Sequence, residues 1–197
     1  MADRQTQQRA NLVDRSKADD LRPTNRRWVV PERTQSTIVD QLLQNRGITD
    51  RERFFAPDFE RDNHDPGLLP SIDKAVERII VAIERREIVA VYADYDADGI
   101  PGGALLVKLL RVNGTTVVPY IPDREKEGYG LNETAIKFLK TQKVSLIITV
   151  DLGITNNMAV STALSSGIDV IVTDHHGIDP DRIPLDAIAM IHPALPG

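Results

Sequence analysis

Apolar, β-branched stretches alternate with amphipathic segments over the second half of the chain. Apolar residues recur at helical spacing over 102–112, 132–140 and 155–166. Short strand-like runs lie before, between and after these segments, at 88–92, 116–121, 145–150, 168–173 and 187–191. Strands that alternate with helices predict right-handed βαβ crossovers. We therefore expect an α/β, Rossmann-like fold, with a mainly parallel five-stranded sheet and helices on both faces.

The first part of the chain has a different pattern. Residues 1–27 are rich in Gln, Arg, Asp and Asn and have few large apolar groups, so we expect a disordered polar tail. Short helical patterns cover 37–46 and 50–55, and Ser71 is a favourable N-cap for a longer helix over 71–86. The expected organisation is a tail at 1–27, a helical preface at 28–70 and an α/β domain at 71–197.

Composition narrows the setting of the protein. The 197 residues, 41% hydrophobic and 27% charged, are typical of a globular protein with one substantial domain. The sequence has no apolar run that predicts a membrane span or a secretory leader, so we expect a cytoplasmic protein. It contains no cysteine, which excludes disulfides and thiolate zinc sites. The net charge of −5 does not by itself indicate nucleic-acid binding, although basic residues can cluster locally.

Acidic residues and histidines follow three of the predicted strands directly. The carboxyl ends of parallel strands meet at one edge of a sheet, so we expect these clusters to converge. Carboxylates and imidazoles without cysteine suit Mn²⁺ or Mg²⁺, which is the chemistry of a metal-assisted phosphoester hydrolase. The clusters are Asp94, Asp96 and Asp98, then Asp151, and then Asp174-His175-His176.

Each cluster taken singly has a structural explanation as well. An Asp-rich turn is commonly only a solvated loop, and an aspartate such as Asp151 is commonly a cap or a strand-end turn. The adjacent histidine pair beside an acid is harder to explain structurally. A calcium loop does not fit the first cluster, because a strand precedes it and a helix follows it. Gly99 and Gly102-Gly103 would let a phosphate approach the backbone N–H groups at that helix start.

Taken together, the clusters resemble the motifs of the DHH phosphoesterase superfamily and, within it, of the RecJ family of single-strand-specific exonucleases. Residues 91–99 resemble the first RecJ motif, 149–154 the second and 172–176 the third. The loop at 121–131 also matches the family. Preface segments at 45–48 and 64–70 follow in the expected order, so that the resemblance covers roughly residues 28–197.

The resemblance implies a set of site residues. Arg124 would contact the DNA backbone, Tyr129 would stack on a base, and Gly102 would lie beside a phosphate. Asp94 would be structural or act through a ligand. His176 would orient a carboxylate, contact the scissile phosphate or donate a proton, and it would act in catalysis with Asp96, Asp98 and Asp151. The implied metal ligands, for two Mn²⁺ or Mg²⁺ ions, are Asp96, Asp98, Asp151, Asp174 and His175.

The chain departs from the family pattern at Tyr92, which is not expected to be a ligand, at Pro101 and at Leu152. Because RecJ-like enzymes continue into further domains, with a fourth metal-binding Asp, we expect an N-terminal fragment and an incomplete DHH domain. The implied function is 5′-to-3′ hydrolysis of single-stranded DNA in repair and recombination, with single-strand-binding or other repair proteins as partners. Two alternatives stay open, namely a DHH-type phosphoesterase for short oligonucleotides or cyclic dinucleotides, and a catalytically inactive remnant.

Overall fold

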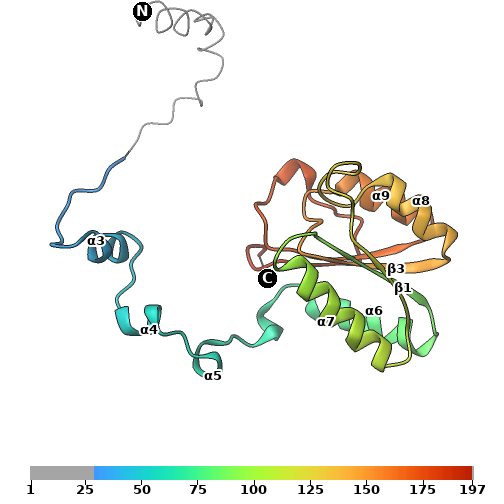
Figure 1. Cartoon of the computed structure of the whole chain (residues 1–197), viewed down its shortest axis with the longest axis horizontal. Coiled ribbons are helices and arrows are strands. Elements are labelled where there is room, and N and C mark those ends of the chain that lie inside the picture. The colour runs from blue at the N-terminus through green and yellow to red at the C-terminus, as the bar shows by residue number, and fades with distance from the viewer. Residues whose placement is uncertain (1–28, 197) are drawn as a thin grey trace, which may run out of the picture. The chain divides into compact units, whose positions relative to one another are not determined.

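The structure is a computed structural model that describes residues 29–196 (Figure 1). The tail predicted at 1–27 lies outside the described residues, as does Trp28 at the start of the predicted preface. Contacts divide the chain into two compact units, of which one ends at Asn63 and the other begins at His64. Residues 64–70, which we assigned to the preface, belong by their contacts to the second unit, and the three-part division stays a prediction.

The described part of the first unit contains three short helices. Each follows a Thr or Asp whose side chain accepts a hydrogen bond from a first-turn amide, which satisfies one of the free N–H groups there. The first two match the predicted patterns, whereas the third has only four residues, too few to produce a periodic pattern. The helices are α3 (Ile38–Asn45), α4 (Arg51–Phe55) and α5 (Phe59–Asp62).

All five predicted strands form in the second unit, and they pair in parallel in the order β2-β1-β3-β4-β5. The chain adds β2 on one side of β1 and β3 on the other, so the topological switch point lies between β1 and β3. The strands are β1 (Ile88–Ala93), β2 (Thr116–Tyr120), β3 (Val144–Val150), β4 (Asp169–Thr173) and β5 (Ala189–Ile191).

Helices cover both faces of this sheet, which confirms the predicted fold class (Figure 1). Along β1, Val89 and Val91 pack in one core with α6 and α7, while Ala90 and Tyr92 pack in a second core with α8 and α9. No helix within residues 29–196 combines the length and the apolar character needed to cross a bilayer. The covering helices are α6 (Ile72–Glu84), α7 (Gly99–Val112), α8 (Glu133–Thr141) and α9 (Asn157–Ser165), with short 3₁₀ turns at Pro66–Leu68 and Pro180–Arg182.

Two helix starts differ from the expectation. Ser71 precedes α6 as predicted, but the prediction that its side chain caps the helix is wrong. Its φ of 60° is left-handed, whereas a capping residue normally has an extended backbone that aims the hydroxyl at the first-turn amides. α7 begins at Gly99 rather than at residue 102, because the Asp96 side chain accepts the Gly99 N–H and starts the helix earlier.

Candidate metal centre

Three backbone hydrogen bonds fix the position of the acidic clusters at the carboxyl edge of the sheet. The amides of Asp94, Asp151 and Asp174 donate to the carbonyls of Val150, Thr173 and Ile191, respectively. Each bond continues the parallel ladder by one residue beyond the end of β1, β3 or β4. The clusters therefore converge as the sequence predicts, at the switch point between β1 and β3 and along the adjoining strand β4.

Asp151 lies at the middle of this edge in an unusual conformation. Its φ is 64°, a left-handed value that is uncommon outside glycine and that often marks a functional position. Thr149 supports the turn, since its hydroxyl donates to the Leu152 carbonyl at 2.7 Å. The Asp151 side chain is 7% exposed, and its Oδ2 has no hydrogen-bond partner among the described residues. A buried, unpartnered carboxylate oxygen is an expected feature of a cation site.

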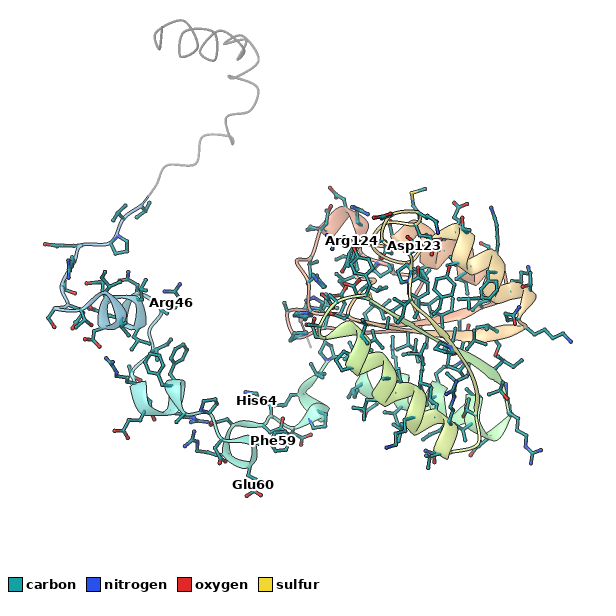
Figure 2. The ribbon with its side chains drawn as sticks, in the orientation of Figure 1. Arg46, Phe59, Glu60, His64, Asp123 and Arg124 are labelled. Carbon is teal, nitrogen blue, oxygen red and sulfur yellow. The ribbon has the colours of Figure 1, made fainter. Side chains whose placement is uncertain are left out.

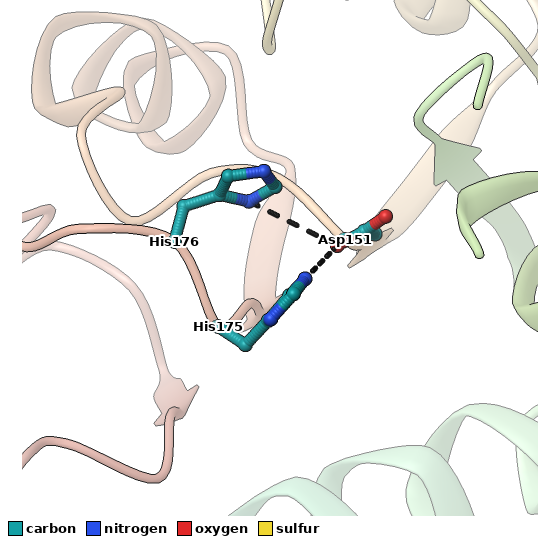
Figure 3. Close-up of side chains that lie close together, drawn as sticks. All are labelled: Asp151, His175 and His176. Atoms are coloured by element: carbon teal, nitrogen blue, oxygen red, sulfur yellow. Dashed lines mark ion pairs between the residues drawn. The ribbon is translucent and has the colours of Figure 1, made fainter. Parts of the chain in front are cut away.

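Burial and two neighbouring carboxylates, Asp98 and Asp96, raise the pKa of Asp151 to about 6. His175 opposes this effect, because its Nε2 lies 2.8 Å from Asp151 Oδ1 (Figure 3). The same Nε2 lies 3.5 Å from Asp98 Oδ2, so the imidazole joins the clusters after β1 and β3. Negative charge that is only partly compensated by protein groups is what a bound cation would neutralise.

Asp174 is held by the protein rather than left free. Its Oδ1 accepts the amides of His175 and His176 and faces His176 Nδ1 at 2.8 Å, while its Oδ2 accepts the Ile154 amide. Burial favours the neutral carboxyl, but these bonds outweigh it and lower the pKa of Asp174. The contact with Asp174 also raises the pKa of His176. The predicted role of Asp174 as a ligand stays a prediction, and its contacts show a residue that orients the histidine pair.

The structure places two groups of possible ligands side by side. Asp94, Asp96 and Asp151 form one group, and Asp151, His175 and His176 form the other, with the ligand atoms of each within 4.8 Å of one another. Asp151 belongs to both groups, so its two oxygens could serve two neighbouring ions. The Gly99 amide holds the Asp96 carboxylate and lowers its pKa, which keeps that group ionised. The donor set of carboxylates and imidazoles fits Mn²⁺ or Mg²⁺.

The candidate site opens into a cavity of about 460 Å³. Asp98, Asp151, Asp174 and His175 line it on the polar side, and apolar residues such as Leu69 line the remainder. A concave, partly apolar site with converging polar groups is typical of an enzyme active site. Asp98 lies at this opening with a 64% exposed side chain, so it could exchange bulk water for an ion at little cost.

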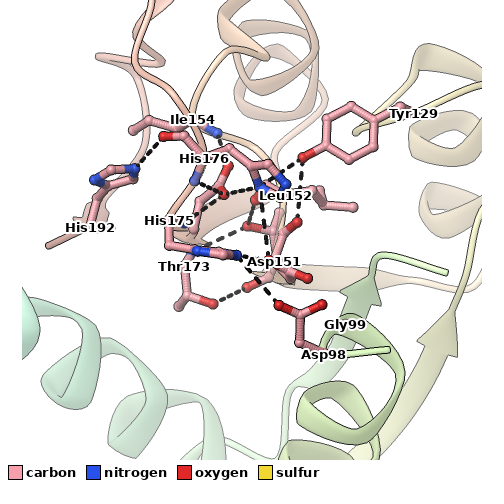
Figure 4. A network of polar contacts seen from close by, with 12 residues as sticks. Asp98, Gly99, Tyr129, Asp151, Leu152, Ile154, Thr173, His175, His176 and His192 are labelled. Atoms are coloured by element: carbon pink, nitrogen blue, oxygen red, sulfur yellow. Dashed lines mark hydrogen bonds and ion pairs between the residues drawn. The ribbon is translucent and has the colours of Figure 1, made fainter. Parts of the chain in front are cut away.

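The predicted substrate-binding residues come from two different segments. Arg124 lies on the loop after β2 (Figure 2), and its guanidinium carbon lies 5.3 Å from the centre of the Tyr95 ring. On the same loop, the Tyr129 hydroxyl lies 3.1 Å from His176 Nδ1 and 3.4 Å from the Asp151 carbonyl (Figure 4). The loop therefore reaches the metal centre, and Tyr129 contacts it through the hydroxyl rather than only through the ring face.

Gly102 lies in the first turn of α7, where that helix packs closely on the sheet. Its amide donates to the Asp98 carbonyl inside α7, so this amide is already used by the helix. A Cβ at Gly102 would lie 3.0 Å from Val150 Cγ1, and one at Gly103 would lie 2.7 Å from the Ala93 Cβ. These glycines let the first turn of α7 pack closely on β1 and β3. Binding of a phosphate at Gly102 stays a prediction without support from a free N–H group.

Two residues at the site, Asp94 and His192, make contacts that the sequence did not predict. Asp94 was expected to be structural or to act through a ligand, yet one of its oxygens belongs to the first ligand group, and its Oδ1 accepts the Tyr95 amide. Spacing alone could have found it, since Asp94 and Asp96 alternate after β1. His192 is buried directly after β5 and donates to the His176 carbonyl, and no sequence signal distinguished it from an ordinary core histidine. Tyr92 is buried, and its hydroxyl donates to the Gly130 carbonyl.

Comparison with known families decides what kind of site this is. Residues 88–197 match the model of the N-terminal domain of the DHH family, which is more than half of the chain. The chain belongs to the DHH family. The matched segment begins at β1 and contains the candidate metal centre, so the DHH motifs and the converging side chains are the same residues.

Within the DHH family, the similar proteins are RecJ single-stranded-DNA-specific exonucleases. The chain is 41% identical to RecJ of Bacillus subtilis over 162 residues, which are 81% of this chain and 20% of that protein. It is 39% identical to RecJ of Thermus thermophilus over 140 residues, covering 68% of this chain and 20% of the relative. The chain thus spans about a fifth of the length of these curated relatives.

Solved RecJ structures resemble this DHH chain in fold as well as in sequence. A manganese-bound RecJ exonuclease matches 68% of this chain and 34% of its own, with a TM-score of 0.61 and 35% identity. A Thermus thermophilus RecJ, also in complex with Mn²⁺, matches 77% of this chain and 20% of its own, with a TM-score of 0.58 and 30% identity. Both of these neighbours bind manganese, the metal that suits the donor set of this site.

Proposed function

We propose that this chain carries the metal-binding part of a RecJ-type exonuclease, which hydrolyses phosphodiester bonds of single-stranded DNA from the 5′ end. The observation that carries the proposal is the position of Asp151, shared by two adjacent groups of possible ligands at the sheet edge. The similar RecJ proteins are single-stranded-DNA-specific exonucleases, which supports single-stranded DNA as the substrate. The proposal includes a cytoplasmic role in DNA repair and recombination, with single-stranded DNA and its binding proteins as partners.

Mn²⁺, or Mg²⁺ in its place, is the proposed cofactor, as two ions at the sheet edge where the two groups of ligands meet. Asp96, Asp98, Asp151 and His175 would hold the ions, and Asp94 adds a carboxylate that the sequence analysis did not count among the ligands. When bound, such ions polarise the phosphodiester and stabilise the charge that develops on its oxygens. The unpartnered Oδ2 of Asp151 is the protein atom with the clearest need for a cation.

Side chains around the ligands would bind and orient the substrate. Arg124 supplies a positive charge for the DNA backbone, and its stacking on Tyr95 limits the directions in which the guanidinium can point. Tyr129 holds His176 through its hydroxyl, and as a residue that is 45% exposed it offers its ring to a base. His176, whose pKa is raised by Asp174, would carry a proton to the leaving oxygen.

A test compares nucleotide release from 5′-phosphorylated single-stranded DNA by the wild-type chain and by Asp96→Ala in the presence of Mn²⁺. Asp96→Ala should lower turnover by more than about 100-fold. Loss of a residue that only orients a metal ligand costs about 10–100-fold, and loss of a ligand itself should cost more. The exposed Asp186, which belongs to neither ligand group, provides a matched Asp186→Ala control that should leave turnover unchanged.

Turnover that survives Asp96→Ala would contradict the proposed centre. No turnover from a folded wild-type chain that still binds Mn²⁺ would favour the second candidate, a remnant that binds metal without catalysis. One observation supports that candidate, namely the exposed apolar face of α7, on which Leu105 is 71% and Val112 is 78% exposed. Faster cleavage of dinucleotides than of long strands would instead indicate another DHH-type phosphoesterase.

A further inference from the structure

A buried histidine outside both ligand groups contacts the backbone of the DHH segment. His192 directly follows β5 and is 1% exposed. Its Nε2 lies 2.8 Å from the His176 carbonyl, and its Nδ1 lies 3.1 Å from the Ala194 amide (Figure 4 shows the contact with His176). Both ring nitrogens therefore have a partner, which is a requirement for a polar side chain at this depth.

The two partners determine where the ring proton lies. The Ala194 amide can only donate, so Nδ1 must accept and carries no proton. The His176 carbonyl can only accept, so Nε2 carries the proton and donates. The hydrogen bonds thus assign one tautomer to His192, with a donor aimed at the peptide that follows His176.

This donor completes a set of contacts that fix the histidine pair. The Asp174 carboxylate accepts the amides of His175 and His176 and holds that segment from one side. His192 donates to the carbonyl of His176 and holds the same segment from the β5 side. With the amides and the carbonyl all engaged, rotation of the 175–176 backbone is restricted, and both imidazoles keep their direction toward Asp151.

We propose that His192 is a positioning residue of the metal centre, which sets the direction of the two DHH imidazoles by donating from Nε2 to the His176 carbonyl. The inference rests on the proposed function for its catalytic consequence, since the imidazoles matter only if they serve an ion or a substrate. The competing explanation is that His192 merely fills the core and ends β5. The two explanations differ in which ring nitrogen matters.

Two substitutions separate the nitrogens. The amide of glutamine in His192→Gln reaches the position of Nε2 and can still donate to the His176 carbonyl. The shorter His192→Asn reaches only the position of Nδ1, so it keeps a partner for the Ala194 amide and loses the donor to His176. Both variants replace an imidazole by an amide, so each is the matched control for the other in polarity and burial.

Mn²⁺ binding, followed by the loss of the free-ion signal in electron paramagnetic resonance, is the first measurement. His192→Asn should weaken Mn²⁺ affinity by about 10–100-fold, the range seen when a group that orients a ligand is lost. His192→Gln should stay near wild type. Urea unfolding of both variants gives the matching stability change. Equal Mn²⁺ affinities of His192→Asn and His192→Gln would overturn the proposal, whether or not the two variants differ in stability.

A second measurement on the metal-free protein does not depend on the proposed function. In a long-range nitrogen–proton correlation spectrum of the wild-type imidazoles, His192 should appear as the Nε2–H tautomer. The ring resonances of His175 and His176 should shift in His192→Asn and much less in His192→Gln. If the wild-type chain binds no Mn²⁺ but these shifts occur, the proposed function fails while the positioning role holds. Unchanged His175 and His176 resonances in His192→Asn would contradict the positioning role itself.

Discussion

At the scale of single residues, the candidate metal centre holds the carboxylate of Asp151 in surroundings that disfavour its negative charge. Burial together with Asp98 and Asp96 raises the pKa of this carboxyl to about 6, well above the value near 4 expected in an unfolded chain. A folded-state pKa above the unfolded one means that the folded protein binds the extra proton. The charged form of Asp151 therefore costs stability at neutral pH, and a bound cation would remove that cost.

Asp151→Asn tests this account through the stability of the metal-free protein. In a chelator, wild-type stability should rise by about 1–2 kcal/mol between about pH 7 and about pH 5, as Asp151 takes up its proton. The Asn variant should be more stable than wild type at about pH 7 and lack this part of the pH dependence, because its amide is neutral and asparagine tolerates a left-handed backbone. Urea unfolding at both pH values measures the effect. If Asp151→Asn is less stable than wild type at neutral pH, the charged Asp151 does not destabilise the fold and this account is wrong. Mn²⁺ binding should be lost in Asp151→Asn whatever its stability.

Residue-scale chemistry was only partly predictable from the sequence. Asp151 and His175 could be found because each follows a strand-like run, and strand ends converge at an edge. The hydrogen bonds of the Asp174 carboxylate could not be predicted, because its four donors come from backbone turns and from a neighbouring ring. His192 gave no signal, since its partner lies 16 positions earlier in the chain.

At the scale of elements, the centre depends on how closely α7 approaches the sheet. A Cβ at Gly103 would lie 2.7 Å from the Ala93 Cβ, a distance that real Cβ atoms essentially never show. A Cβ at Gly102 would lie 3.0 Å from Val150 Cγ1, a methyl that side-chain rotation can move. Close packing of these two glycines on β3 and β1 therefore fixes the position of the helix start that follows Asp98.

Gly103→Ala should lower the free energy of unfolding by about 1–3 kcal/mol, the typical cost of an extra methyl in a packed core. This is expected although alanine favours a helix over glycine by about 1 kcal/mol. Gly102→Ala, one residue earlier in the same turn, is the matched control and should cost less or stabilise. Chemical denaturation of both variants gives the comparison. Equal stability changes at the two positions would contradict the close approach of α7 to β1.

Most elements could be predicted because their burial imposes a pattern. β1 and β3 are buried on both faces and consist largely of Val, Ile and Ala, a run that is typical of a central parallel strand. α5 has four residues, which is shorter than the period that a sequence pattern needs. The prediction that Ser71 caps α6 was wrong because a serine caps a helix only when its backbone is extended. The turn before α6 instead gives Ser71 a φ of 60°.

At the scale of the α/β unit, the two edges of the sheet serve different purposes. The carboxyl edge carries the acidic groups, whereas the amino edge carries an ion network around Arg78 of α6. Its guanidinium bonds Glu87, which precedes β1, and Asp169 at the start of β4, both at 2.7 Å. Ser145 of β3 donates to the same Glu87 oxygen. The network thus ties one covering helix to three neighbouring strands, at the opposite end from the metal centre.

This network should contribute stability without affecting metal binding. Arg78→Met leaves the partly buried Glu87 carboxylate without its cationic partner, so we expect a loss of about 2–4 kcal/mol in urea unfolding at about pH 7. Burial opposes ionisation of Glu87, but the bonds from Arg78 and Ser145 outweigh it and lower its pKa. A lowered folded-state pKa gives stability that is present above the unfolded pKa and lost as pH falls through the folded one. The penalty of Arg78→Met should therefore shrink in acid, the reverse of the Asp151 contribution. Arg111→Met, which changes an exposed arginine, is the matched control and should leave the stability nearly unchanged. Unchanged Mn²⁺ affinity in Arg78→Met would show that the two edges act independently. A large loss of Mn²⁺ affinity would mean that the sheet transmits changes from one edge to the other.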